Sequence, residues 1–383
     1  MIRESQLCRA WPKKSLSEVA EFLDNRRKPV KASERHEGKY PYYGANGQQG
    51  TINNYIFDEP LVLLAEDGGH FGEPEKSIAY TISGRTWVNN HAHVLRPVNG
   101  TDLQYLFRHL QHYDLTKYIN GTTREKLTKS QAESIIIAVP SLAEQRRIAA
   151  ILDKADAIRR KHEQALALAD DFLRSTFLHM FGDPVTNPIG WPVGTLRDLI
   201  KEVKYGTAQK AYSTGKYPIL RMGNITYQGG WDLTDLKYID LSGADRQAYL
   251  VQFDDILFNR TNSKDLVGKT AVFDQREEYI FAGYLVRARV NDRADPYYIS
   301  AYLNSRHGKE TLRSMCKSII GMANINAQEF LNLSIALPEI ETQKEFRRKV
   351  EAVKSTCDSH RQAHIMANGL FLSLSQRAFR GEL

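Results

Sequence analysis

Amide and basic side chains gather in two short segments whose residue types suit the reading of nucleic-acid bases. Asn46, Gln48 and Gln49 surround a predicted tight turn, and the polar run Asn259–Lys264 leaves a predicted strand. Asn and Gln can bond adenine at two points, while Arg and Lys read guanine or hold phosphate. A plain loop between strands also explains the first segment, and a solvated turn explains the second. Both interpretations stay open on these residues alone.

The loop before the last predicted strand of each half is also polar. Thr122–Lys126 occupies this place in the first half, and Met322–Asn326 occupies it in the second. Side chains of these types make phosphate and base contacts in protein–DNA complexes. The candidate DNA-binding residues are Tyr43, Asn46, Gln48, Gln49, Thr123, Arg124, Lys126, Arg221, Asn224, Asn259, Arg260, Asn262, Lys264, Lys269 and Asn324.

Motifs for nucleotide binding and hydrolysis are incomplete. The run Val267-Gly268-Lys269-Thr270 is similar to the end of a phosphate-binding loop, but Ser263 stands where that loop needs its first glycine. A strand, and not a helix, is predicted to follow it. We therefore predict no catalytic and no cofactor-binding residue in this chain. A cryptic enzyme that uses the Gly268–Thr270 loop is the alternative, and nucleotide binding by the isolated chain would support it.

The histidines show no complete metal-binding pattern. His91 and His93 alternate along a predicted strand, and we expect them not to assemble into a site. His360 and His364 are one helical turn apart, but no third ligand completes a zinc set. We interpret His360 and His364 as polar residues within the contact between two helices. We predict no metal site, and metal binding by the isolated chain would contradict this prediction.

Composition bounds the class of protein. The 383 residues carry a net charge of +7 and 42% hydrophobic residues, which predicts two or three domains. This net positive charge is compatible with nucleic-acid binding but does not require it. Three scattered cysteines imply neither disulfides nor a zinc site. Apolar runs are too short to span a bilayer, and no apolar signal core follows Met1, so we expect no membrane association and a cytoplasmic location.

Two long stretches organise the chain, one from Val139 to Pro184 and the other from Leu337 to Gly381. Each follows a strand-like apolar run that stops at a proline, Pro140 or Pro338. The residues that follow are rich in helix formers, and Gly182 suits the stop of the first stretch. At 1.5 Å per residue, each helix would be about 60 Å long. Helices of this length must lie against something equally long.

The same landmarks recur in both halves, so the chain contains a duplicated domain and not a solenoid. The matched positions are Trp11-Pro12 with Trp191-Pro192, Tyr40-Pro41 with Tyr217-Pro218, Asp102 with Asp295, Pro140 with Pro338, Gln145 with Gln343, and Gly182 with Gly381.

Each half is predicted to be a globular α+β domain followed by a helical arm. Short amphipathic helices are expected at Ser15–Asn25 and Thr195–Glu202. The expected strands are Tyr40–Tyr55, Pro60–Ala65, Ile78–Ser83, His91–Arg96, Tyr217–Met222, Ile256–Asn259, Thr270–Phe273 and Tyr284–Val290. The expected domains are residues 1–140, the helical spacer 141–183, residues 184–338 and the helical spacer 339–383.

Apolar residues recur along both arms at three- and four-residue steps, which is the coiled-coil period. They are Ile148, Leu152, Ala155, Leu166, Ala169, Leu173 and Met180 in the first arm, and Phe346, Val350, Val353, Cys357, Ala367, Phe371, Leu374 and Ala378 in the second. Two arms of similar length in one chain most simply pack on each other. Packing of each arm on its own globular half is the alternative, although a 140-residue domain is only roughly 30–40 Å across.

The run Pro140-Ser141-Leu142-Ala143-Glu144-Gln145-Arg146-Arg147-Ile148 resembles the DNA-specificity (S) subunit of type I restriction–modification systems. The resemblance extends over essentially the whole chain, through the repeated Trp-Pro starts to the ending Phe379-Arg380-Gly381-Glu382-Leu383. The second copy of the motif is degraded, with Thr342 and Phe346 replacing the glutamate and isoleucine of the first. Local symmetry between the copies is therefore inexact.

The resemblance implies a non-catalytic subunit that binds double-stranded DNA sequence-specifically. Two target-recognition domains would each read one half of a split target, and the arms would form an antiparallel coiled coil with pseudo-twofold symmetry that spaces them. Two modification subunits would bring S-adenosylmethionine, and restriction subunits would bring ATP hydrolysis and Mg²⁺. This chain would hold none of these cofactors. Because the recognition loops of the two halves differ, the target should be asymmetric.

A structural adaptor that binds protein and not DNA is the other interpretation of two folded domains on a coiled coil. A DNA pull-down in the presence of a methyltransferase partner separates the two. The spacer interpretation also makes a prediction of its own. Lengthening both arms by one turn, about 5.4 Å, should change the unread gap by one or two base pairs, and an unchanged gap would contradict it.

Overall fold

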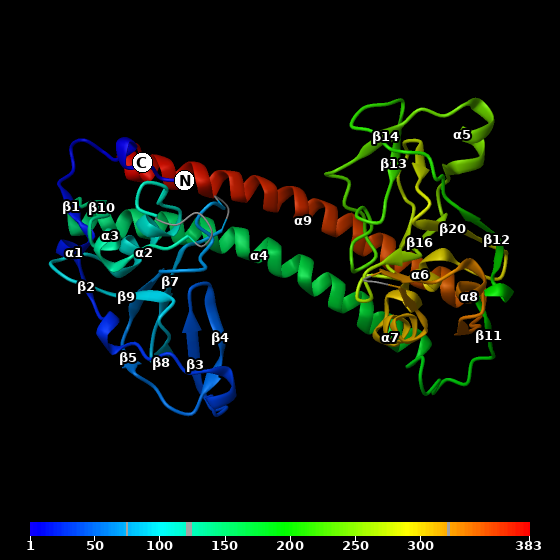
Figure 1. Cartoon of the computed structure of the whole chain (residues 1–383), viewed down its shortest axis with the longest axis horizontal. Coiled ribbons are helices and arrows are strands. Elements are labelled where there is room, and N and C mark those ends of the chain that lie inside the picture. Colours follow the sequence, from blue (N-terminus) through cyan, green and yellow to red (C-terminus); the bar gives the residue numbers. More distant parts are fainter. Residues whose placement is uncertain (74–75, 120–124, 320–321) are drawn as a thin grey trace. The chain divides into compact units, whose positions relative to one another are not determined.

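The computed structural model of the chain describes residues 1–73, 76–119, 125–319 and 322–383. The chain divides into two compact units. Unit 1 contains Met1–Glu163 and Arg361–Leu383, and unit 2 contains Gln164–His360. Both units combine strands with helices, as the α+β prediction requires (Figure 1).

Unit 1 is built on two four-stranded sheets with strand orders β2-β9-β6-β7 and β4-β3-β8-β5, together with the antiparallel pair β1-β10. Its strands are β1 (Lys13–Ser15), β2 (Ala20–Phe22), β3 (Tyr40–Gly44), β4 (Gly47–Ile52), β5 (Phe57–Asp58), β6 (Leu61–Ala65), β7 (Ala79–Ile82), β8 (Arg85–Val88), β9 (Ala92–Pro97) and β10 (Ile136–Ala138). Its short helices are η1 (Glu4–Gln6), α1 (Leu16–Val19), η2 (Asp24–Arg26), η3 (Ala32–Glu34), α2 (Leu103–Gln111) and α3 (Lys129–Glu133).

Unit 2 repeats this plan with sheets β12-β20-β16-β18 and β14-β13-β19-β15, the pair β11-β23, and an added small sheet β17-β22-β21. Its strands are β11 (Val193–Thr195), β12 (Ile200–Tyr205), β13 (Tyr217–Leu220), β14 (Lys237–Ile239), β15 (Leu250–Val251), β16 (Ile256–Asn259), β17 (Thr261–Asn262), β18 (Thr270–Val272), β19 (Tyr279–Phe281), β20 (Leu285–Val290), β21 (Lys317–Ile319), β22 (Met322–Asn324) and β23 (Ser334–Ala336). Its short helices are η4 (Leu196–Asp198), α5 (Gly243–Tyr249), α6 (Pro296–Asn304), α7 (Arg306–Met315) and α8 (Ala327–Leu331).

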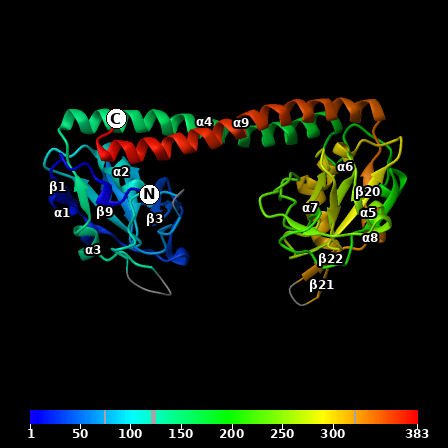
Figure 2. The same cartoon turned by 90° about the horizontal axis from the view of Figure 1, so that it is seen from above.

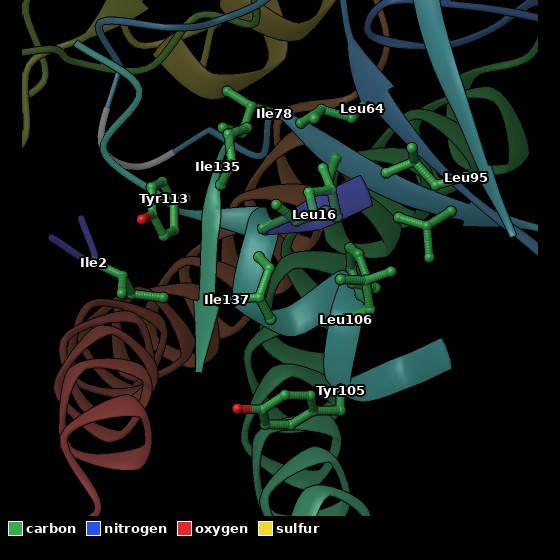
Figure 3. Close-up of a cluster of buried hydrophobic side chains, with 14 of the residues drawn as sticks. Ile2, Leu16, Leu64, Ile78, Leu95, Tyr105, Leu106, Tyr113, Ile135 and Ile137 are labelled. Carbon is green, nitrogen blue, oxygen red and sulfur yellow. The ribbon is translucent and has the colours of Figure 1, made fainter. Parts of the chain in front are cut away.

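The core of unit 1 forms where the apolar faces of these elements meet. Every residue of β6 is buried, and Leu64 packs with Leu95 of β9 and Leu106 of α2. Figure 3 shows these side chains converging with Leu16 and Ile137. Such burial stabilises by about 25 cal/mol per Å² of apolar surface, so the sheet and α2 hold each other in place.

The predicted helices at residues 15–25 and 195–202 are wrong beyond their first turn. Helix α1 begins with a capping box between Ser15 and Glu18, but the chain is already extended at Ala20 because β2 pairs with β9. In unit 2, η4 is followed by β12, which pairs with β20. The amphipathic pattern fits one helical turn and one strand equally well, and distant pairing partners decide between them.

The two long helices are confirmed as α4 (Leu142–Phe181) and α9 (Ile340–Arg380). Each ends at a glycine with positive φ, +79° at Gly182 and +74° at Gly381, a backbone that side chains with a Cβ adopt at a cost. Gly369 lies inside α9, and the helix continues through it. One glycine in a helix costs about 1 kcal/mol relative to alanine, and Phe371, two residues further on, is buried in the core of unit 1.

Within each unit, α4 and α9 pack against each other, as expected for the arms. In unit 1, Arg147 near the start of α4 donates to the Leu383 carbonyl oxygen at 2.8 Å, and Phe371 of α9 joins the core that contains Leu152. In unit 2, the rings of Phe177 and Phe346 lie 5.8 Å apart. Early residues of one helix therefore meet late residues of the other, so the pairing is antiparallel.

A repeated hydrogen-bond junction explains why the glutamines recur. Gln145 accepts from the Asp102 backbone N–H at 2.8 Å and donates to the Pro140 carbonyl at 3.0 Å. In unit 2, Gln343 accepts from the Asp295 N–H at 2.9 Å and donates to the Pro338 carbonyl at 2.8 Å. Both glutamines are buried. Each therefore joins the start of a long helix to the N-cap residue of a short helix, α2 in unit 1 and α6 in unit 2.

Candidate nucleic-acid interface

In unit 1, the predicted turn at residues 44–47 is a β-hairpin between β3 and β4, with Tyr43 opposite Gln48. Gln48 and Gln49 are exposed, as is Asn46, whose amide donates to the Gly68 carbonyl at 2.8 Å. The hairpin is therefore bound to the loop that follows β6 and holds its amide side chains at the surface.

A buried tyrosine holds the base of this hairpin. The Tyr80 hydroxyl donates to the Gly44 carbonyl, and its ring lies 5.8 Å from that of Tyr43. Burial raises the pKa of Tyr80, so the hydroxyl stays a donor at neutral pH. Asn89 also donates to the Gln49 side-chain oxygen at 3.1 Å. The hairpin thus has a defined place before any ligand binds.

Lys126 contacts the loop that follows β6, the same loop to which Asn46 is hydrogen-bonded. Its ammonium lies 3.1 Å from Glu66, and the Leu127 N–H donates to the Glu66 carbonyl at 2.8 Å. The structure therefore brings together the 46–49 hairpin and Lys126 around the loop that starts at Glu66. Thr123 and Arg124 lie outside the described residues and stay predictions.

A buried ionic network holds this loop. The Arg27 guanidinium lies 2.6 Å from Glu66 and 3.3 Å from Asp24, and His93 Nδ1 lies 2.6 Å from Asp24. His93 Nε2 faces the Leu127 carbonyl at 2.9 Å. Burial alone would raise the pKa of Asp24, but the hydrogen bond and charge of His93 outweigh it, so this pKa falls below its ordinary value of 3.8. The carboxylate is therefore charged at neutral pH.

The expectation that His93 would not assemble with other groups is wrong. Ligand atoms of Asp24, Glu66 and His93 lie within 4.8 Å of one another. Both ring nitrogens of His93 face oxygen atoms, of Asp24 and of the Leu127 carbonyl, and Glu66 meets two cationic side chains. In this structure the three side chains partner one another and the neighbouring cations, and the absence of a metal site stays a prediction.

In unit 2, two predicted segments form one small sheet. Thr261 of β17 pairs with Asn324 of β22, and the Ile325 N–H donates to the Arg260 carbonyl at 2.9 Å. The Arg260 guanidinium donates to the Asn324 side chain at 3.2 Å and lies 4.8 Å from the Tyr205 ring centre. Asn262 is half-buried beside them. Figure 2 shows the β21–β22 hairpin projecting from unit 2 on the side away from α9.

The carbonyl oxygen of Met222 connects a third segment to Asn259 of β16 and to Lys269, which precedes β18. It accepts from Lys269 Nζ at 2.8 Å and from the Asn259 amide at 3.3 Å. Both side chains are buried, and burial lowers the pKa of Lys269. Asn224 is also buried, and its amide donates to the Asp232 carbonyl at 2.9 Å. These three residues hold the 221–235 loop in place.

The predicted residues of unit 2 therefore fall into two groups. Lys264 is exposed, and Arg221, Arg260, Asn262 and Asn324 are partly exposed, with Arg221 paired to Asp235 at 2.9 Å. The buried residues Asn224, Asn259 and Lys269 have internal partners. Their burial favours a role in positioning the loops over direct contact with DNA. The predictions of contact stay predictions.

The sequence interpretation missed the residues that anchor the loops of unit 1. Asp24 and Arg27 lie in and just after η2, far along the chain from Glu66 and His93. Local periodicity carries no signal for such a network. Alternating acidic and basic residues before a polar loop were the only available hint, and such charges most often lie on a solvated surface.

Two segments, residues 9–167 and 188–365, match the family model described as the type I restriction modification DNA specificity domain. The chain belongs to this family. Each match contains one set of the hydrogen-bonded landmarks described above. The prediction from the Pro140–Ile148 motif is thus confirmed for the family and for the tandem arrangement of its domains.

Relatives carry the same description. A Haemophilus influenzae protein with a provisional name as a type I restriction enzyme specificity subunit is 39% identical over 145 residues, which cover 38% of this chain and 37% of that protein. The EcoKI specificity subunit of Escherichia coli is 25% identical over 285 residues, covering 69% of this chain and 61% of that subunit. The aligned part is thus less than two thirds of the length of either relative.

Solved structures share the fold. The crystal structure of a type I restriction–modification S subunit from M. genitalium has a TM-score of 0.61 at 14% identity and covers 96% of both chains. A chain from work on complex assembly and conformational transition of a type I system has a TM-score of 0.52 at 16% identity, covering 98% of this chain and 99% of that one. At these identities the likeness shows the fold alone.

None of the helices in the described ranges combines the length and the apolar character that crossing a bilayer requires.

Proposed function

We propose that this chain reads a split, asymmetric DNA target within a type I restriction–modification complex, with one half-site for each unit. One observation supports the proposal above all: the two units share a frame, the repeated sheets, helices and glutamine junctions, but carry different loops. The frame recurs down to the hydrogen bonds of Gln145 and Gln343, whereas the exposed loop residues differ in both type and charge. A frame of this kind can present two independent sets of base contacts.

Unit 1 offers amides at a hairpin tip, which suit adenine. Gln48 is exposed, and only its amide nitrogen has a partner among the described residues, the Gly50 carbonyl at 3.1 Å. Unit 2 offers a mixed patch of guanidinium, amide and ammonium groups. Asn262 accepts from the Ser263 N–H at 2.8 Å, and its NH₂ group bonds no other described residue. Both side chains keep hydrogen-bonding groups for a base edge.

The direct test maps the methylated motif of a host that carries this chain, its single-loop variants, or no copy. A bipartite motif that disappears on deletion is expected. Gln48→Ala should relax one half of the motif and Asn262→Ala the other, because each loop would face one half-site. Each variant is the matched control for the other. Changes in both halves from one substitution, or an unbroken motif, would contradict the two-reader proposal.

Docking of modification subunits is the second part of the proposal. The long helices expose large apolar side chains in both units: Ile158, Ile365, Met366 and Leu370 in unit 1, and Leu168, Phe172 and Leu178 in unit 2. Ile365 and Met366 are 66% and 67% exposed. Adjacent exposed apolar residues on a helix favour a protein partner. We further propose that restriction subunits join this assembly.

Substitution on α9 tests the docking surface. Ile365→Glu should weaken co-purification with the modification subunit, because a carboxylate would enter an apolar contact. Gln362→Glu adds the same charge at an exposed polar position three residues away and should leave it unchanged. Equal behaviour of the two variants would count against docking at this surface.

We propose no catalytic role for this chain and place S-adenosylmethionine, ATP and Mg²⁺ in the partner subunits. The incomplete motifs in its own sequence support this. The adaptor alternative, protein binding without DNA binding, shares the docking surface but not the base contacts. A DNA pull-down with the modification subunit present separates them, because an adaptor would not enrich the target over unrelated DNA.

A further inference from the structure

Unit 2 contains a cavity of about 600 Å³ that is lined by none of the candidate DNA-binding residues. Three segments enclose it: the last turns of α4, the helices α6 and α7, and the first turns of α9, with the 227–229 loop at one side. The volume falls within the range of small-molecule sites, roughly 300–1,000 Å³. The cavity shares residues 227–229 with the 221–235 loop, but the proposed base contacts involve none of its lining residues.

One wall of the cavity is apolar. It includes Leu173 and Phe177 of α4, Phe346 and Val350 of α9, and Ala301 of α6. Phe177, Phe346 and Val350 belong to the main core of unit 2, so this wall is set by the fold itself. It would receive the hydrocarbon or aromatic part of a ligand.

Lys309 provides the polar end. Its ammonium donates to the Tyr227 carbonyl at 2.5 Å and lies 3.4 Å from the Tyr227 ring centre. An ammonium has three N–H donors, and this carbonyl takes one. Across the described ranges, no carboxylate lies within ion-pair distance of Lys309. Burial and the positive charge of Arg174 lower the pKa of Lys309 to about 8.

The remaining charges around the cavity are paired or stand at its rim. Lys354 of α9 pairs with Asp274 at 2.7 Å, and Arg306 of α7 pairs with Glu310 at 2.9 Å. Arg174 pairs with Asp171 on the exposed side of α4. The lining residues Asp170 and Asp183 are exposed, and His307 completes the titratable groups. Lys309 is thus the lining cation that lacks a carboxylate partner among the described residues.

An acceptor without a partner adds to the polar end. The Asn304 side-chain oxygen is buried without a hydrogen bond, while its NH₂ group donates to the Thr270 and Ser300 carbonyls at 2.7 and 2.9 Å. Buried polar atoms usually have partners. Asn304 and Lys309 both line the cavity, so a hydroxyl or protonated group on a ligand could satisfy this oxygen.

We propose that this cavity binds a small organic anion with an apolar body, its charged group at Lys309 and its body against Phe177, Phe346 and Val350. The charge complementarity and the apolar wall favour this class over a neutral ligand or an inorganic ion. The proposal does not depend on DNA recognition, and it leaves the proposed function unchanged if it fails.

The test uses 1-anilinonaphthalene-8-sulfonate as an apolar anion and N-phenyl-1-naphthylamine as its neutral counterpart. Titration of the folded full-length chain should give one saturable fluorescent site for the anion and weaker binding of the neutral compound. Lys309→Met should weaken the anion about ten-fold, the effect of losing one charged hydrogen bond. Lys309→Arg should retain binding, and Lys201→Met, at an exposed lysine outside the cavity, should change nothing.

Dependence on pH gives a second readout. Affinity for the anion should fall between pH 7 and 9 as Lys309 loses its proton, and Lys309→Arg should remove this fall. Equal binding of the charged and neutral compounds to the wild-type chain would overturn the proposal, even if Lys309→Met failed to fold. An affinity unaffected by Lys309→Met in a folded variant would overturn it as well.

Discussion

At the end of β6 in unit 1 stands Glu66, and at the equivalent end of β16 in unit 2 stands Arg260. Both backbones accept the same hydrogen bond, from Leu127 in one unit and Ile325 in the other. The side chains have opposite charge, and so do their surroundings: Glu66 faces two cationic side chains, whereas Arg260 faces an amide and a tyrosine ring. The backbone is repeated, while the electrostatics of the loops is not.

The difference teaches how a duplicated domain can carry two unlike sets of loops on one frame. The frame depends on buried backbone hydrogen bonds and apolar contacts, which tolerate few substitutions. The loops depend on local side-chain partners, so each unit can change its own anchor without disturbing the frame. In unit 1, ion pairs hold the loop that starts at Glu66, whereas in unit 2, hydrogen bonds to the Met222 and Asp232 carbonyls hold the 221–235 loop.

Removing the central carboxylate of unit 1 should have the largest effect. Asp24→Ala leaves Arg27 and buried His93 without their shared partner, and breaking a buried ion pair in this way costs about 3–5 kcal/mol. Hydrogen exchange should show loss of protection in unit 1 and little change in unit 2. Asp58→Ala removes an exposed pair with Arg85 and should cost about 0–1 kcal/mol. Equal effects of the two variants would show that the network is not an anchor.

Substitution of the repeated glutamines tests the claim of a common frame. Gln145→Leu and Gln343→Leu each leave a backbone N–H and a carbonyl without partners, at about 1–3 kcal/mol. Each variant should loosen the start of one short helix, α2 or α6, by a similar amount in hydrogen exchange. A large loss in one unit and none in the other would show that the frame is not shared.

Loss of the Lys269 anchor should have a smaller effect on stability and a selective one on recognition. Lys269→Met removes the hydrogen bond to the Met222 carbonyl, which contributes about 1.5–3 kcal/mol to stability. The net loss should be smaller, because the variant no longer buries a charge. The 221–235 loop should exchange faster, and discrimination between target and mismatched DNA should fall more than binding to unrelated DNA. Lys264→Met, at an exposed position, should instead weaken both equally. The opposite result, with selective loss for Lys264→Met and uniform loss for Lys269→Met, would show that the two assignments are wrong.

Lowering the pH should produce the smallest of these effects, a loss of the stability that Asp24 gives to unit 1. Because the pKa of Asp24 in the folded chain is below 3.8, its contribution to stability is complete above pH 3.8 and is lost as pH falls through the lowered value. The difference in unit 1 protection between wild type and Asp24→Ala should therefore narrow below pH 3.8. The Asp58→Ala variant serves as the reference at each pH. If the difference in protection stays constant down to pH 2, the charge of the Asp24 carboxylate does not stabilise unit 1.

The sequence predicted features whose causes are local. The long helices follow from helix-forming residues between a proline and a glycine, and the hairpin at residues 44–47 follows from its turn residues. The short helices were overextended because β9 and β20, far along the chain, decide the conformation of residues 20–22 and 200–205. The network at Asp24 has the same character, since His93 is 69 positions away.

Unit 1 is completed by both ends of the chain. The Cys8 N–H donates to the Phe379 carbonyl at 2.8 Å, and Phe371 and Phe379 fill the core beside Ile148. Unit 2, in contrast, is one continuous segment, Gln164–His360. During translation, unit 2 can therefore close as soon as its last residue leaves the ribosome. Most of unit 1 is synthesised first, but part of its apolar surface stays uncovered until the end of α9 is made. During that interval the exposed surface favours aggregation.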